Sequence, residues 1–484
     1  MTDAVSTTLT TSERWKLIVL LSASFTLAVD FSVLNIALPQ IGRDVGLDTT
    51  ALQWVITAFA LPAAGFGLLF GRLGDLIGRR RLFMIGISLL GIGSIIGGVA
   101  PTAAVLLTGR VVQGFGAAAV APTALSLLTT SFEEGPRRTR ALGINGALIA
   151  AGFTVGALLG GILTTGISWR AAFWINLPIT LVVLIVTPTL FPANRPDTKP
   201  RLDWPGAILI SIALTALVFG LTVAGDHGLG TWQPYPWLAA AVILGALFAW
   251  RELHAAHPLV TLSILRRRTI AVGNLTGLTT FSMMSSATYL LTLYLQDVLS
   301  LNALLSGIVI AVVGVVSITV ANFIPKLIGI FGLRTLVIAA LTLQGIGMIV
   351  IAFAGASAWA VAIIIAGRII AGLGHIGSII GYTAMSSSGL PDNEQGLATG
   401  LATTSQQVGI ALGTPLMASI LALTLTVTST DSASTAALRT GLATTIAVNG
   451  LILIAVALLV VLLLLRSGSP DRLANHDPAA QPAR

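Results

Sequence analysis

The sequence predicts an all-α membrane protein of fourteen transmembrane helices, with two helices inserted between two six-helix repeats. The first observation is composition, because mean hydropathy is +0.94 and only 9% of the residues are charged, whereas soluble domains carry roughly 25%. The second is a succession of uncharged apolar runs of about 20 residues, which is the length that crosses a hydrocarbon core as a helix. The third is a sequence repeat between the two halves of the chain.

The apolar runs define the helices in order. They are expected at residues 16–38, 52–71, 82–100, 104–129, 141–164, 171–191, 205–225, 237–252, 271–297, 304–328, 334–355, 359–385, 396–426 and 441–465. The eighth is short because Arg251 and Glu252 close its apolar run. The first run, Leu17 to Leu38, is too long for the apolar part of a signal peptide, so we expect no cleaved leader.

The basic residues orient these helices. An even number of spans places both termini on one side, and that side carries 21 of the 26 Lys and Arg residues, against three in the opposite loops. Because cytoplasmic loops are enriched in Lys and Arg, both termini are predicted to be cytoplasmic. Residues 467–484 are polar and rich in Pro and Ala, and are expected to form a disordered cytoplasmic tail.

The internal repeat divides the chain into domains. GRVVQGFG from Gly109 reappears as GRIIAGLG from Gly367, an offset of 258, and GRLG from Gly71 aligns with GIFG from Gly329 at the same offset. In the fifth helix VGALLG matches VGIALG at an offset of 253. We therefore expect a six-helix half at 1–192, a linker with two additional helices at 193–269, and a second six-helix half at 270–466. Such repeats place a central site at their interface near the bilayer midplane.

Composition and missing motifs exclude several functional classes. The net charge of +8 does not indicate nucleic-acid binding, because the basic residues lie in short loops rather than on one face. The chain has no cysteine, so disulfides, thiolate metal sites and cysteine nucleophiles are excluded. No phosphate-binding loop, H-E-x-x-H site or G-x-S-x-G motif occurs, so an ATP-driven pump or an enzyme has no support. No cofactor or metal is expected.

A glycine-rich basic loop follows the second helix. Its glycines permit a tight turn and close helix contact, its aspartate can accept bonds from free backbone N–H groups, and its arginines can pair with acids or lipid phosphates. A plain topogenic loop would also be basic, but would not need this glycine and aspartate spacing. The residues expected to form a gating loop are Gly71, Gly74, Asp75, Gly78, Arg79 and Arg80.

These motifs together resemble the major facilitator superfamily, and within it the 14-helix drug:proton antiporter family. GRLGDLIGRRR, from Gly71, fits the G-x-x-x-D-x-x-G-R-[RK] signature of the superfamily. LAVDFSVLNIALP (27–39), LLTGRVVQGFGAA (106–118) and WRAAFWINLP (169–178) resemble further motifs of the family. The fifth-helix motif, expected to pack through Gly152, Gly156, Gly160 and Gly161, departs from the family pattern because Ala157 stands where a proline is usual.

The resemblance implies a function as well as a fold. It implies a monomeric multi-pass protein of a bacterial inner membrane that exports small lipophilic compounds, cationic or neutral, in exchange for protons by alternating access. Its partners would then be the lipid bilayer, the exported compound and protons. Three alternatives stay open: export of one dedicated metabolite or antibiotic, uptake by proton symport, and a non-transporting receptor on a transporter fold.

Ionisable side chains inside the apolar runs are the first candidate site residues, because charges at mid-bilayer are costly and usually functional. Asp30 lies within the first helix and could load and release a proton; a structural hydrogen bond to a neighbouring helix is the alternative. The resemblance implies that Asp30 serves proton coupling and substrate recognition, with Arg110 as its partner. Arg368 is the repeat counterpart of Arg110, and His375 lies seven residues further on the same helix.

Polar and aromatic side chains cluster in the ninth and thirteenth helices, where helix–helix hydrogen bonding is their ordinary role. A subset could line a cavity for amphipathic ligands; the candidates are Asn35, Thr288, Tyr289, Tyr294, Arg368, His375 and Gln406. No second carboxylate is evident in the spans of the C-terminal half. The sequence therefore favours monocations or neutral compounds over dications.

Overall fold

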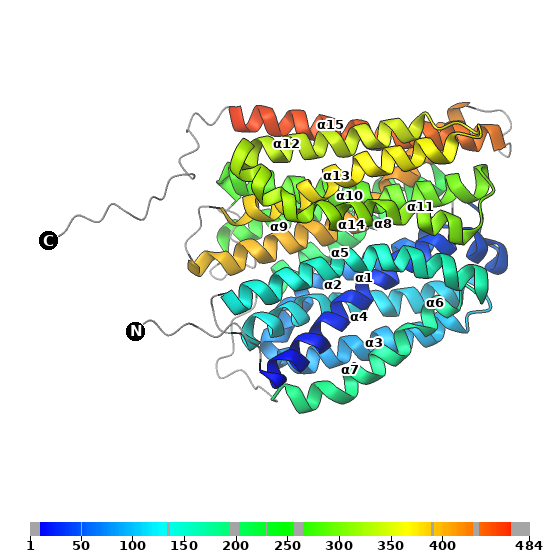
Figure 1. Ribbon diagram of the computed structural model, residues 1–484. Coiled ribbons are helices and arrows are strands. Elements are labelled where there is room, and N and C mark those ends of the chain that lie inside the picture. Colours follow the sequence, from blue (N-terminus) through cyan, green and yellow to red (C-terminus); the bar gives the residue numbers. More distant parts are fainter. Residues whose placement is uncertain are drawn as a thin grey trace.

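The protein is seen in a computed structural model that describes residues 10–49, 51–132, 136–192, 203–228, 230–255, 265–388, 392–428 and 435–465. All regular structure in these ranges is helical (Figure 1). The helices of the N-terminal half are α1 (Thr11–Val45), α2 (Gln53–Ile77), α3 (Arg79–Gly98), α4 (Ala103–Ser131), α5 (Pro136–Gly166), α6 (Ala171–Trp174) and α7 (Asn176–Leu190). The inserted pair is α8 (Trp204–His227) and α9 (Tyr235–His254). The C-terminal half holds α10 (Arg268–Leu293), η2 (Tyr294–Val298), α11 (Ala303–Val320), η3 (Ala321–Phe323), α12 (Ile324–Ala352), α13 (Ala360–Ser387), α14 (Asp392–Thr428) and α15 (Thr435–Leu465).

The described helices account for the fourteen predicted spans. Thirteen segments, with α6 and α7 counted as one, have the length and apolar composition to cross a membrane. The remaining predicted span is α10, which has 26 residues but carries Asn, Thr and Ser along its length. The start of α1 and the end of α15 lie at the same end of the bundle (Figure 1).

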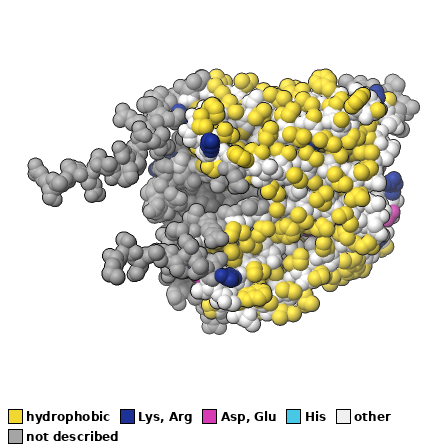
Figure 2. All heavy atoms as spheres, viewed as in Figure 1, with side chains coloured by type: hydrophobic (Ala, Val, Ile, Leu, Met, Phe, Trp, Pro, Cys, Tyr) yellow, Lys and Arg dark blue, Asp and Glu magenta, His cyan; other side chains and the backbone are white. Residues whose placement is uncertain are grey.

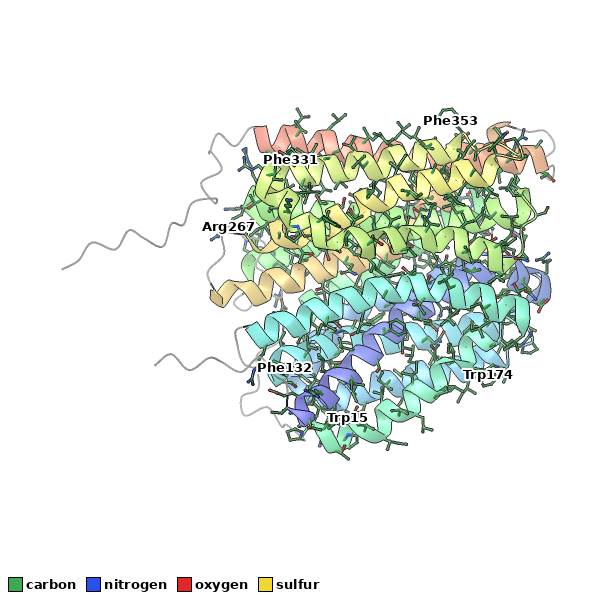
Figure 3. The ribbon with its side chains drawn as sticks, viewed as in Figure 1. Trp15, Phe132, Trp174, Arg267, Phe331 and Phe353 are labelled. Atoms are coloured by element: carbon green, nitrogen blue, oxygen red, sulfur yellow. The ribbon has the colours of Figure 1, made fainter. Side chains whose placement is uncertain are left out.

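The surface of the bundle is suited to lipid. Apolar side chains cover the face shown in Figure 2, and the few basic side chains lie toward its two ends. Exposed aromatic side chains also lie toward the ends, Trp15 and Phe331 near one and Trp174 and Phe353 near the other (Figure 3). Aromatic belts of this kind are typical of the two membrane–water interfaces.

The same close contacts at glycines occur in both halves, and they show which helices of the two halves correspond. A Cβ added to Gly116 of α4 would lie 2.7 Å from the carbonyl oxygen of Gly86 in α3, and one added to Gly374 of α13 would meet the carbonyl oxygen of Ala340 in α12 in the same way. The two halves therefore pack their equivalent helices alike, and they lie in the lower and upper parts of Figure 1. The inserted α8 packs against α2 and α14 and so bridges the halves.

Two predicted boundaries differ from the structure. The gating loop was expected to run from Gly71 to Arg81, but α2 continues to Ile77 and α3 begins at Arg79, so the turn consists of Gly78 alone. Gly78 has φ 100°, a conformation that side chains with a Cβ disfavour. Its counterpart is Gly332 (φ 79°), which interrupts α12 at an offset of 254. The predicted offset of 258 at this loop, from aligning Gly71 with Gly329, is therefore wrong by four residues, or about one helical turn. The two loops correspond instead at Gly78 and Gly332, the glycines with positive φ.

Other predicted helix boundaries also differ from those in the structure. The predicted sixth helix is divided at Ile175 into α6 and α7. Residues 329–333 were predicted to be a loop but lie within α12, which begins at Ile324, ten residues before the predicted start, so that residues 324–328 belong to α12 and not to the predicted tenth helix. The predicted ninth helix ends in the wider turn η2. The tail at 467–484 lies outside the described residues.

Candidate functional site

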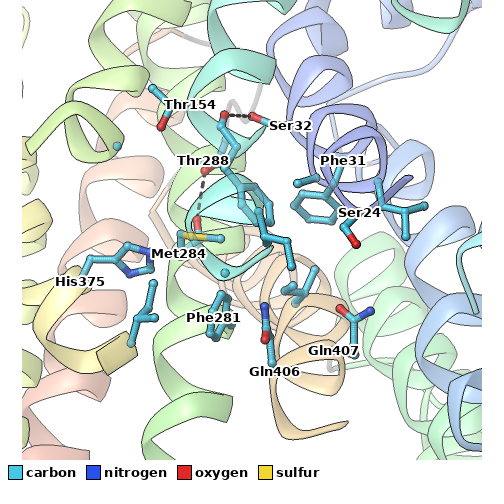
Figure 4. Close-up of a pocket in the computed structure, with 18 of the residues that line it drawn as sticks. Ser24, Phe31, Ser32, Thr154, Phe281, Met284, Thr288, His375, Gln406 and Gln407 are labelled. Atoms are coloured by element: carbon cyan, nitrogen blue, oxygen red, sulfur yellow. Dashed lines mark hydrogen bonds between the residues drawn. The ribbon is translucent and has the colours of Figure 1, made fainter. Parts of the chain in front are cut away.

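A cavity of about 450 Å³ lies between the two halves of the bundle. Its walls come from α1, α2, α4 and α5 on one side and from α10, α11, α13 and α14 on the other. Figure 4 shows Ser24 and Phe31 of α1 across the cavity from Phe281, Met284 and His375. The cavity therefore lies at the repeat interface, where the internal duplication predicts a central site.

The cavity wall is mainly apolar and aromatic, with scattered polar groups. Ser, Thr, Asn and Gln side chains supply neutral hydrogen-bonding groups, among them Gln406 and Gln407 of α14 (Figure 4). Arg368 is a charged lining residue, whereas no Asp or Glu occurs among the described residues that line the cavity. Such a wall suits a lipophilic ligand that carries a few polar groups.

The bundle is closed at the end where α1 finishes. There the Gln296 amide donates a hydrogen bond of 2.8 Å to the carbonyl oxygen of Ile36, and the Leu304 backbone N–H donates one of 3.2 Å to the Thr165 hydroxyl. Both bonds join the N-terminal half to the C-terminal half. The cavity extends toward the opposite end, where α1 begins, which the positive-inside prediction assigns to the cytoplasm.

Asp30 lies at the centre of a fully buried polar network. Its Oδ2 accepts a 2.6 Å hydrogen bond from Arg110 Nη1 within an ion pair. Its Oδ1 accepts bonds from the amide nitrogens of Gln113 at 3.0 Å and Asn176 at 2.6 Å. The Ser94 hydroxyl accepts further bonds from the same two amides. Each described side chain that contacts the Asp30 carboxyl donates a hydrogen bond to it.

Arg110 connects this network to the cavity wall. Its Nε donates to the carbonyl oxygen of Val55 at 3.1 Å, and its guanidinium lies over the Phe59 ring at 4.4 Å from the ring centre. Phe59 and Phe31 line the cavity, whereas Asp30 and Arg110 do not. The structure thus joins the two predicted coupling residues but separates them from the cavity by aromatic side chains.

Arg368 and His375 border the cavity from α13. Arg368 Nη2 donates a hydrogen bond to the carbonyl oxygen of Ile310, while Nε is enclosed without a partner in the described structure. His375 packs its ring against Phe281, with ring centres 6.2 Å apart, and its Nδ1 is enclosed without a partner. Both residues were predicted to be cavity candidates.

The other predicted cavity residues divide into two groups. Thr288 and Gln406 line the cavity. Asn35, Tyr289 and Tyr294 do not: the Asn35 amide donates to its own helix, at the carbonyl oxygen of residue 31, and the Tyr294 hydroxyl donates to the carbonyl oxygen of residue 355. The hydroxyl of Tyr289 lies 3.4 Å from the carbonyl oxygen of residue 49. These three side chains belong to packing and to the closed end.

Sequence reasoning missed three members of the polar network: Ser94, Gln113 and Asn176. Each is a single neutral polar residue in an apolar run, a pattern that usually reflects helix packing. Gln113 carried a usable signal, because it lies three residues after Arg110 and so on the same helix face. Asn176 lies within the WRAAFWINLP motif.

The predicted gating segment packs tightly. A Cβ on Gly71 would lie 3.4 Å from the Pro122 side chain of α4, and one on Gly74 would lie 3.2 Å from that of Thr123. Arg80 Nη1 donates to the carbonyl oxygen of Phe191, at 2.8 Å. The Asp75 side chain lies outside the described structure.

The glycines of the fifth-helix motif bring α5 against α1. A Cβ on Gly152 would lie 2.7 Å from that of Ala28, one on Gly156 would lie 2.8 Å from the carbonyl oxygen of Val29, and one on Gly160 would lie 2.5 Å from that of Val33. Gly161 instead packs against α11, at the carbonyl oxygen of residue 303. The segment forms part of one continuous helix of 31 residues through position 157.

Comparison with known proteins identifies the family. The model of the Major Facilitator Superfamily matches residues 20–414. The chain is 31% identical over 390 residues to the multidrug resistance protein Stp of Mycobacterium tuberculosis, covering 80% of this chain and 71% of that protein. It is 33% identical over 409 residues to the puromycin resistance protein pur8 of Streptomyces alboniger, covering 82% and 80%.

A third relative and a solved structure complete the comparison. The cephamycin export protein CmcT of Amycolatopsis lactamdurans is 37% identical over 305 residues, covering 62% of this chain and 63% of that protein. The crystal structure of the POT family transporter PepTSo matches with a TM-score of 0.70 at 14% identity, covering 93% of this chain and 98% of that chain. At this identity the structural match shows the fold alone.

Proposed function

We propose that this chain, which belongs to the Major Facilitator Superfamily, exports lipophilic drugs or toxic compounds across a bacterial inner membrane in exchange for protons. It is a multi-pass membrane protein whose relatives include a multidrug resistance protein, a puromycin resistance protein and a cephamycin export protein. The inner-membrane location, the proton coupling and the antiport belong to the proposal. We propose that it works as a monomer.

The observation that carries proton coupling is the buried pair of Asp30 and Arg110. Both side chains are 0% exposed, and their contact is 2.6 Å. Protonation of Asp30 would leave the guanidinium without its counter-ion, which is strongly unfavourable in a buried site. A proton on Asp30 therefore changes the relative stability of the conformations in which this pair is formed or separated.

The proposed cycle uses that change. In the conformation described here the cavity extends toward the predicted cytoplasmic end, and the Asp30 carboxyl has only hydrogen-bond donors around it. Substrate enters the cavity in this deprotonated state. After reorientation Asp30 takes up a proton from outside and substrate is released there. Return to the first conformation re-forms the pair with Arg110 and expels the proton inward. The turn at Gly78 acts at the cytoplasmic end as a latch.

The expectation of cationic substrates loses support in the cavity. A cation would be stabilised by a carboxylate in the wall, and the described wall residues include none. The apolar and aromatic wall supports lipophilic ligands, and the neutral part of the expectation is kept.

A proteoliposome experiment tests this function. Vesicles containing the protein and an internal pH-sensitive dye receive a neutral lipophilic compound such as chloramphenicol under an imposed proton gradient. Proton movement that depends on the compound and disappears with a proton ionophore is expected. Absence of such movement across a panel of lipophilic compounds would contradict proton-coupled export, and would also be the result for a non-transporting receptor.

A second candidate function is export of one dedicated compound. It is favoured by the printed name of one relative, the cephamycin export protein. Transport of a single compound from a chemically diverse panel would support this candidate over broad drug export. Proton movement in the same direction as the compound would instead indicate symport.

A further inference from the structure

The cavity is bordered by a buried charge that no described acidic side chain balances. Arg368 is 5% exposed and borders the cavity. Within the described part of the chain its one hydrogen bond is to the carbonyl oxygen of Ile310, and it has no ion pair with an Asp or Glu. An isolated charge in an apolar site is costly unless it is paired and hydrogen-bonded.

The equivalent arginine of the N-terminal half, Arg110, shows which partner Arg368 lacks. Arg110 Nε donates to the carbonyl oxygen of Val55 in α2, and Arg368 Nη2 donates to that of Ile310 in α11, so each of these repeat-related arginines is bonded to a backbone carbonyl of the second helix of its half. Arg110, however, is paired with Asp30.

The position equivalent to Asp30 follows from the glycine contacts. Gly156 and Gly160 of α5 pack on the carbonyl oxygens of Val29 and Val33, and their counterparts in α14, Gly409 and Gly413, pack on those of Leu278 and Ser282. These pairs relate α1 to α10 by an offset of 249, so Thr279 occupies the position of α10 that is equivalent to Asp30 in α1. The C-terminal half thus keeps the arginine and lacks the acid.

We propose that the exported compound supplies this missing counter-ion, so that substrates carry a carboxylate or a similar acidic group that pairs with Arg368. This inference rests on the proposed function and deepens it by naming the substrate class. The acidic group binds at the α13 wall, while the apolar body of the compound occupies the cavity between Phe31 and Phe281.

The chemistry of the wall favours this assignment. A guanidinium has five N–H donors and no acceptor, and it stays charged in proteins, so it selects planar acidic acceptors. Charge-assisted hydrogen bonds of this kind are stronger than neutral ones. His375, further along α13, adds a ring nitrogen without a partner in the described structure. No carboxylate among the described lining residues repels the acidic group.

A pair of dyes that differ at one group tests the proposal. Rhodamine 110 has a free carboxyl group and rhodamine 123 is its methyl ester. Binding of each dye to the full-length purified protein is measured by fluorescence anisotropy, with wild type, Arg368→Gln, Arg368→Lys and Lys326→Gln. Lys326 is exposed and does not line the cavity, so its variant controls for simple loss of a positive charge.

The wild type is expected to bind the acid about tenfold more tightly than the ester, as a charge-assisted bond predicts. Arg368→Gln should bring the ratio close to one, Arg368→Lys should keep part of the preference, and Lys326→Gln should keep all of it. Equal binding of the two dyes by the wild type, or a preference that survives in Arg368→Gln, would overturn the proposal. If Arg368→Gln does not fold, loss of part of the preference in Arg368→Lys decides the question.

Proton-coupled flux of the same dyes separates this inference from the proposed function. A preference for the acid without proton-dependent flux would keep the role of Arg368 and contradict proton-coupled export. Flux of both dyes without a preference would keep export and contradict the role of Arg368.

Discussion

Removal of the negative charge at position 30 is expected to destabilise the protein and to be compensated by removal of the positive charge at position 110. Asp30→Asn leaves the Arg110 guanidinium buried without a counter-ion, at a site where both side chains are 0% exposed. Breaking a buried ion pair by removing one partner costs about 3–5 kcal/mol. The double variant Asp30→Asn/Arg110→Gln has no unpaired charge, so it should be more stable than Asp30→Asn alone.

The assay is a double-mutant cycle on purified protein in detergent, read by thermal or denaturant unfolding. The account predicts a coupling free energy of about 3 kcal/mol or more, because the penalties of the single variants share one cause. The ion pair between Arg251 and Asp203 is the control: its contact is 3.1 Å, but the Arg251 side chain is 42% exposed, so its coupling should be far smaller. Additivity at Asp30 and Arg110 within about 0.5 kcal/mol would refute the reasoning.

Three further outcomes follow from the packing and the closed end. Gly156→Ala should destabilise the protein in the same unfolding assay, because the new Cβ would lie 2.8 Å from a carbonyl oxygen of α1. The control Gly67→Ala, whose Cβ would have no atom within 4 Å, should be neutral or stabilising. Gly78→Ala should reduce transport and stability because it strains a residue with φ 100°, while Gly245→Ala in α9 should be tolerated; equal behaviour of the two variants would contradict this. Gln296→Ala removes a 2.8 Å hydrogen bond that joins the halves, so spin labels across the closed end should report a larger open population; an unchanged distance distribution would exclude this gating role.

The sequence predicts which charged residues of the apolar runs form the buried pair, but it does not predict the contacts of the neutral polar residues around them. Asp30 and Arg110 stand out because charges are rare in spans, and the structure brings them together. Asn176 binds the same carboxyl, yet nothing in its own run distinguishes it from a packing residue. The positions of Tyr289 and Tyr294 depend on which face of α10 turns toward the cavity, and a helix with so many polar residues does not reveal that face.

Two features of the fold were also beyond sequence reasoning. Residues 329–333 were expected to be a loop between two predicted helices, but the structure continues the helix from Ile324 up to the left-handed Gly332. The absence of an acid in the described cavity wall required knowledge of which side chains meet there. That finding removes support for the cationic part of the cationic-or-neutral expectation, and the proposal of a substrate with an acidic group starts from it.

Coupling of protons to export through Asp30 can be isolated by comparing two transport modes in the same proteoliposomes. Exchange of labelled for unlabelled compound needs no net proton movement, whereas accumulation against a concentration gradient needs it. Asp30→Asn is expected to keep exchange and to lose accumulation driven by a proton gradient. Accumulation by Asp30→Asn at the level of the wild type would contradict the account and require a different proton site.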